Sequence, residues 1–156
     1  MPVSRSPDNR HSTPSRSNTL RYAGSRTTAV WEAFKRLAGD PIFVLGPGPA
    51  GCVYGSTAMP LEVFRHDPRA GSSEHLGAMP GGEVYSFLEH EQKLYLCYYG
   101  GAIMNLYDPA KPWSWGSTPA SNPISFGGVG DGHLRPRAMI HGPDGKIYVG
   151  SEPPYG

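Results

Sequence analysis

The stretch Glu83–Pro109, EVYSFLEHEQKLYLCYYGGAIMNLYDP, decides the expected fold of this chain. It contains three apolar runs, separated by a polar turn and by a pair of glycines: Glu83–Leu88, Lys93–Tyr98 and Ala102–Tyr107. Runs of this length between polar, glycine and proline residues are typical of β-strands joined by tight turns. The stretch therefore predicts three short strands in succession.

Parts of this stretch repeat elsewhere in the chain. Val53-Tyr54 returns as Leu94-Tyr95, and Asp67-Pro68 returns as Asp108-Pro109, with 41 residues separating both pairs. A third unit begins at Ile147-Tyr148. Periods of about 40 to 50 residues that carry several short strands are typical of propeller blades. We therefore expect an all-β chain that forms an incomplete β-propeller of about two and a half four-stranded blades.

The blade boundaries follow from the repeat. The units are expected at about residues 41–82, 83–130 and 131–156, the last being truncated. The predicted strands of the first and third units are Pro41–Leu45, Gly51–Gly55, Leu61–Phe64, Arg137–Ile140 and Lys146–Val149. Gly142-Pro-Asp-Gly145 joins the last two as a hairpin turn, because Pro143 presets φ and Asp-Gly tolerates positive φ.

The residues before the repeats have a different composition. Residues 1–27 are rich in Arg and Ser and poor in large apolar side chains, which predicts a disordered tail. The same composition also fits an organellar transit peptide. Trp31, Phe34 and Leu37 recur at every third position before Gly39, so we expect a short helix over residues 28–40.

Composition and charge limit the classes of partner. The 156 residues include 21 Gly and 17 Pro, about twice ordinary usage, which excludes long helices. The net charge of +1 gives no electrostatic reason to expect nucleic acid or a membrane surface as partner. No apolar run approaches the roughly 20 residues that span a bilayer, and no secretory signal is present, so we expect a soluble protein of unassigned compartment.

The middle unit resembles a known repeat. Gly100-Gly101, then Tyr107-Asp108-Pro109, then Trp113 are similar to the kelch repeat, and Ala78-Met79-Pro80 is also kelch-like. The Gly142–Gly150 turn and strand instead resemble those of lactonase-like and quinoprotein-like propellers. These resemblances imply a propeller that binds ligands around its central channel.

One segment concentrates polar side chains at a strand entrance. The candidate ligand-binding residues there are Asp131, His133, Arg135 and Arg137, beside Gly130 and Gly132. The planar guanidinium of Arg135 is suited to a carboxylate or sugar-acid oxygen. The alternative is a solvated loop in which Arg135 braces the neighbouring blade.

The aromatic residues have two interpretations. Trp113 and Trp115, on a loop bounded by prolines, are further candidates for ligand or partner contact. Packing between blades is the alternative use of repeated aromatic residues.

No sequence pattern assigns a metal, a cofactor or a catalytic residue. The histidines are scattered over different units without ligand spacing. Cys52 and Cys97 lie near equivalent strands and are expected as small core residues without a disulfide.

Two functions remain open. The first is a fragment of a kelch-like propeller that binds a protein or carbohydrate through its channel-entrance loops. The second is part of a propeller lactonase, lyase or dehydrogenase that acts on a sugar or sugar acid. In either case we expect that missing blades or self-association would be needed to close the ring.

Overall fold

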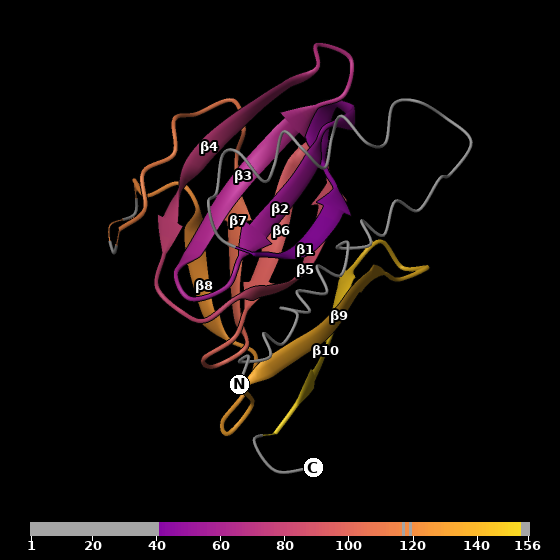
Figure 1. Ribbon diagram of the computed structural model, residues 1–156. Helices are drawn as coiled ribbons and strands as arrows, with labels where there is room; N and C mark the ends of the chain where they lie inside the picture. Colours follow the sequence, from indigo (N-terminus) through magenta and orange to yellow (C-terminus); the bar gives the residue numbers. More distant parts are fainter. Residues whose placement is uncertain (1–40, 117, 119, 154–156) are drawn as a thin grey trace, which may run out of the picture.

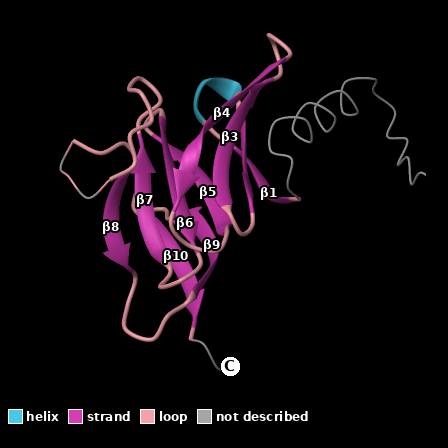
Figure 2. Cartoon of the chain, turned by 60° about the vertical axis from the view of Figure 1, so that its left-hand side comes forward, coloured by secondary structure: helices cyan, strands magenta, loops and turns pink. Residues whose placement is uncertain are grey.

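The computed structural model describes residues 41–116, 118 and 120–153. The tail predicted at residues 1–27 and the helix predicted at 28–40 lie outside this range. Within it every regular element is a β-strand, apart from one 3-10 turn at Pro49–Gly51 (Figures 1 and 2). The prediction of an all-β chain is confirmed. None of the described residues forms a helix long and apolar enough to cross a membrane.

The strands form three antiparallel sheets, each of which follows chain order. Sheet 1 contains β1 (Ile42–Pro47), β2 (Val53–Thr57), β3 (Leu61–Asp67) and β4 (Ser72–Met79). Sheet 2 contains β5 (Val84–His90), β6 (Lys93–Tyr98), β7 (Ile103–Tyr107) and β8 (Ile124–Gly128). Sheet 3 contains β9 (Arg135–His141) and β10 (Ile147–Glu152).

Several strand boundaries differ from the sequence prediction. β6 has the predicted bounds, whereas β1 continues through Gly46 and Pro47, beyond the predicted strand end at Leu45. The prediction named no strand over β4 or β8, because these outermost strands are mostly exposed and lack an apolar alternation. Arg135 was expected in a loop but lies in β9, paired with Glu152.

Sheets 1 and 2 pack face to face around one core, and sheet 3 lies against sheet 2. β1 lies beside β5, and β5 lies beside β9, so the first strands of the three sheets are neighbours (Figure 1). We call β1, β5 and β9 the inner strands. The core fills the space between sheets 1 and 2 and includes Tyr54, Leu61, Val63, Phe87, Leu94, Leu96 and Tyr107. Apolar burial on this scale is the main stabilising contribution to such a fold.

Each inner strand carries one extra residue relative to its partner strand. These β-bulge residues are Phe43 in β1, Tyr85 in β5 and Arg137 in β9. The partner residues opposite the position after each bulge are Ser56, Cys97 and Gly150. The three sheets can therefore be aligned by a common register.

This register makes the repeated tyrosines equivalent. Tyr54, Tyr95 and Tyr148 each lie two residues before the aligned position in the second strand of their sheet. The repeat found in the sequence thus corresponds to a repeat in strand pairing.

Candidate ligand-binding site

The three bulge residues lie in a row across the inner strands. The rings of Phe43 and Tyr85 are 5.4 Å apart between centroids and meet edge to face at 62°. The guanidinium carbon of Arg137 lies 5.4 Å from the centroid of the Tyr85 ring, within cation–π range. We call Phe43, Tyr85 and Arg137 the bulge row. A bulge turns a side chain away from the regular alternation of its strand, so each sheet contributes one side chain to this row.

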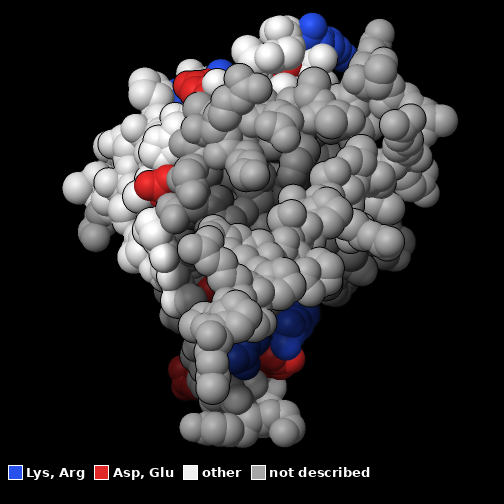
Figure 3. All heavy atoms as spheres, in the orientation of Figure 1, with Lys and Arg blue, Asp and Glu red and all other residues white. Residues whose placement is uncertain are grey.

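A carboxylate joins the two predicted arginines. Glu152 Oε1 accepts a hydrogen bond from Arg137 Nη2 at 2.6 Å and one from Arg135 Nη1 at 3.4 Å. The hydrogen bond from Arg137 lowers the pKa of Glu152, so this carboxylate is ionised at neutral pH. Two positive charges therefore face one negative charge. Charged atoms of both signs gather at the lower end of the molecule, over the part where Figure 1 draws sheet 3 (Figure 3).

Arg135 also contacts the loop that follows β6 of sheet 2. Its guanidinium carbon lies 5.3 Å from the centroid of the Tyr99 ring, in the loop that follows β6. Arg137 thus lies over a tyrosine ring of sheet 2 and Arg135 over a tyrosine ring of the loop after β6. These are the bracing contacts that the sequence left as an alternative. More than half of the Arg137 side chain is nevertheless exposed, so its guanidinium remains accessible to a ligand.

The remaining two candidates of the predicted loop, His133 and Asp131, lie in different environments. His133 Nδ1 lies 2.7 Å from Ser151 Oγ, next in the chain to Glu152. Asp131 lies exposed between the glycines of the same loop. The structure therefore brings His133, Arg135 and Arg137 to the end of β10 and leaves Asp131 in solvent.

The two tryptophans lie elsewhere and are packed. The Trp113 ring is 5.2 Å from the Tyr107 ring of β7, and it lies against Gly77 of β4. The Trp115 ring is 6.5 Å from Tyr98. Trp113 therefore fills space between sheets 1 and 2, and both rings lie against the core.

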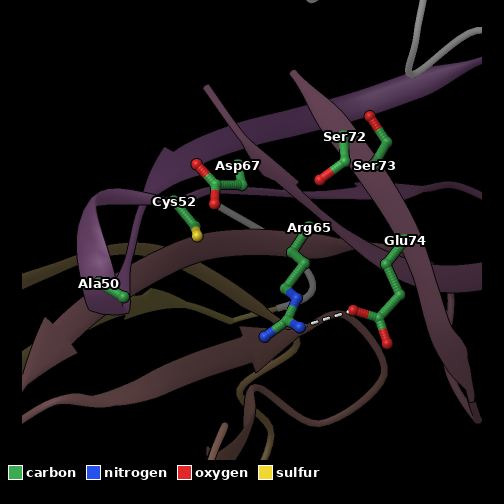
Figure 4. Close-up of a pocket in the computed structure, with 7 residues that line it drawn as sticks. All are labelled: Ala50, Cys52, Arg65, Asp67, Ser72, Ser73 and Glu74. Carbon is green, nitrogen blue, oxygen red and sulfur yellow. Dashed lines mark ion pairs between the residues drawn. The ribbon is translucent and has the colours of Figure 1, made fainter. Parts of the chain in front are cut away.

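A hollow in sheet 1 was not anticipated from the sequence. Its volume is about 260 Å³, and it is lined by Ala50, Cys52, Arg65, Asp67, Ser72, Ser73 and Glu74 (Figure 4). Arg65 Nη2 and Glu74 Oε2 are 2.7 Å apart across the β3–β4 pair. Because no strand was predicted over β4, these two charges could not be paired from the sequence. The Arg65–Glu74 pair is neutral as a whole, and Asp67 is the remaining charged residue among those that line the hollow.

Within the described part of the chain, the cysteines and histidines form neither a disulfide nor a metal-binding cluster. Cys52 and Cys97 are buried free thiols. Among the described residues, no three His, Cys, Asp or Glu side chains are grouped so as to hold a metal ion. Comparison with protein-family models, curated proteins and solved structures gave no match.

Proposed function

We propose that this chain is part of a β-propeller binding protein and that its ligand contacts the bulge row together with Arg135. The observation that carries the proposal is the bulge in each of three adjacent inner strands, which directs one side chain per sheet into a single row. Bulges are often found next to functional sites, where they aim a side chain. In a propeller, the innermost strands surround the central channel.

The arrangement of the sheets supports the propeller assignment. Sheets 1 and 2 are four-stranded antiparallel meanders that pack face to face, and their inner strands are neighbours. The kelch-like residues agree with this arrangement, because Trp113 bridges the two sheets and Gly100 and Gly101 both adopt positive φ. Sheet 3 repeats the register of the first two with its two strands.

The chemistry of the site favours an acidic ligand, such as a sugar acid. Arg135 and Arg137 exceed the charge of Glu152 by one, and the guanidinium fork of Arg137 suits a carboxylate. Phe43 and Tyr85 add an aromatic surface at the other end of the row. A ligand with a carboxylate and an apolar ring face would use both ends.

Calorimetric titration with gluconate, glucuronate and glucose tests this proposal. We expect both acids to bind and neutral glucose to bind far more weakly. Arg137→Gln removes one charged donor and should weaken acid binding by roughly 10- to 100-fold. Arg69→Gln, in the turn between β3 and β4, removes the same charge away from the inner strands and should leave the affinity unchanged.

A second variant tests the role of Glu152. Glu152→Gln removes the carboxylate that competes with the ligand for both guanidiniums, so the affinity for gluconate should increase. Equal affinity for acids and glucose, or equal affinity of the Arg137→Gln and Arg69→Gln variants, would contradict the proposed site.

A further inference from the structure

The common register identifies the equivalent side chains that face the preceding sheet in the chain. Leu45, Phe87 and Met139 are equivalent, because each lies two residues after a bulge residue. Phe87 faces sheet 1, where a Cβ added to Gly46 would lie 3.0 Å from the Phe87 Cβ. Phe87 and Met139 are 9% and 7% exposed, whereas Leu45 is 40% exposed. The position that is buried in sheets 2 and 3 is therefore open in sheet 1.

The same comparison applies to the opposite face. Tyr54 packs against Tyr107 of sheet 2, with ring centroids 6.4 Å apart, and is 1% exposed. The equivalent Tyr95 is half-buried, and Tyr148 of sheet 3 is 50% exposed. Ile140, equivalent to Gly46, is 60% exposed. The burial of these tyrosines follows the size of the next sheet. That sheet has four strands for Tyr54 and two for Tyr95, and among the described residues no sheet covers Tyr148.

We infer that a second copy of this chain docks head to tail, with the Leu45 side of its sheet 1 on the Ile140–Tyr148 face of sheet 3. This inference rests on the proposed propeller arrangement. In the docked pair, Leu45 of one copy meets Ile140 of the other as Phe87 meets Gly46 within the chain. The contact between copies thus has the same geometry as the contact between sheets 1 and 2 within one chain. The side chains at the equivalent positions are uncharged in both.

The direction of docking follows from the two exposed faces, which carry Leu45 on sheet 1 and Ile140 and Tyr148 on sheet 3. A two-fold contact between two copies of sheet 3 would cover Ile140 and Tyr148 but leave Leu45 in water. Head-to-tail docking covers all three side chains. Burial of such apolar surface favours association and opposes the entropy lost when two copies bind. Contacts of this heterologous type give closed rings when the rotation closes, and otherwise give open chains.

Cysteine cross-linking tests the docking and its direction. Leu45→Cys and Ile140→Cys are prepared separately in the full chain, one with a tag that changes its mass, then mixed and oxidised with diamide. We expect the mixture to give the mixed dimer. Each variant alone should form no more disulfide-linked dimer than the unmodified protein, whose Cys52 and Cys97 are buried. Lys111→Cys, in the exposed loop after β7, is the control partner and should not cross-link to either.

Sedimentation of the unmodified protein provides the second measurement. At about 100 μM, where a micromolar Kd leaves most copies bound, the mass should exceed the 16.8 kDa of one chain. Tyr148→Lys should reduce it to one chain, while Lys111→Cys should not.

Two results would overturn the inference: cross-linking of Ile140→Cys alone, which indicates two-fold docking, or a monomer that forms no mixed dimer. A monomer that still binds gluconate through Arg137 would leave the proposed function intact. A protein that docks head to tail but binds no acid would instead contradict only the ligand assignment.

Discussion

Two buried side chains, Tyr54 and Cys97, keep their protons at a pH where the unfolded chain loses them. Burial raises the pKa of Tyr54 from 10.0 to about 12 and the pKa of Cys97 from 9.0 to about 12. The folded form therefore binds more protons than the unfolded form above about pH 9, and the free energy of unfolding falls as pH rises toward about 12.

Urea unfolding at a series of alkaline pH values measures this loss of stability. In Cys97→Ala, the part of the decline that begins near pH 9 should be smaller than in the unmodified protein, whereas the part due to Tyr54 should remain. A stability independent of pH across this range would show that neither group holds its proton in the folded state.

The candidate site could be predicted in part, residue by residue. Arg135 and Arg137 stood out in the sequence because two cations lie beside glycines at a strand entrance. Phe43 and Tyr85 did not, because an aromatic residue within an apolar run is ordinary strand composition. Their role depends on a bulge, and a bulge is a property of strand pairing that one sequence does not display.

The same limit applies to whole strands. Runs with apolar side chains on a buried face, such as β6, were predicted with the correct bounds. All residues of β8 are exposed, so its sequence carries no alternation of burial to detect. The repeated Asp-Pro pairs lie at strand ends: Asp67 ends β3, and Asp108 follows β7.

The loop that joins β7 to β8 depends on one buried amide. Asn122 Oδ1 accepts the Asp108 N–H at 2.8 Å, and Asn122 Nδ2 donates to the carbonyls of Asp108, Lys111 and Pro112 at 2.9–3.1 Å. This amide fixes the loop that carries Trp113 to the space between sheets 1 and 2.

Removal of the amide should therefore destabilise the protein. Asn122→Ala removes the four hydrogen bonds that this buried side chain makes to the loop backbone, and we expect the free energy of unfolding to fall by about 1–3 kcal/mol. Ser125→Ala is the control, because the Ser125 hydroxyl makes only an exposed hydrogen bond at 3.4 Å. Equal stability of the two variants in urea unfolding would show that Asn122 does not hold the loop.

The whole molecule is unevenly stabilised. The main core cluster lies entirely between sheets 1 and 2, and Met139 is the buried large apolar side chain of sheet 3. Regions with few buried apolar contacts open locally at lower free energy than the rest. Sheet 3 should therefore open without unfolding of the other two sheets.

Amide hydrogen exchange measures this difference. We expect the paired amides of β9 and β10 to exchange faster than those of β2, β3, β6 and β7, in a protein kept dilute so that copies do not dock. Uniform protection across the three sheets would show that the chain opens as one unit. At high concentration, head-to-tail docking should slow exchange in sheet 3 first.

The all-β class and the repeat could be predicted from the sequence, since the repeated tyrosines occupy equivalent positions in the strand register of the three sheets. The sequence did not show which sheet faces remain exposed to solvent. That follows only from the alignment of Leu45, Phe87 and Met139 across the sheets.

The spacing of the bulge residues has one more consequence, for how such a chain can change length. Tyr85 follows Phe43 by 42 positions, whereas Arg137 follows Tyr85 by 52. Part of the extra length lies in the loop between Asp108 and Pro123. This loop joins β7 to β8, the two strands of sheet 2 that lie farthest from its inner strand. Insertions there leave the spacing of the bulge row in space unchanged. Provided that Trp113 and Asn122 keep their contacts, this loop can thus be extended, by evolution or by loop grafting, without disturbing the row.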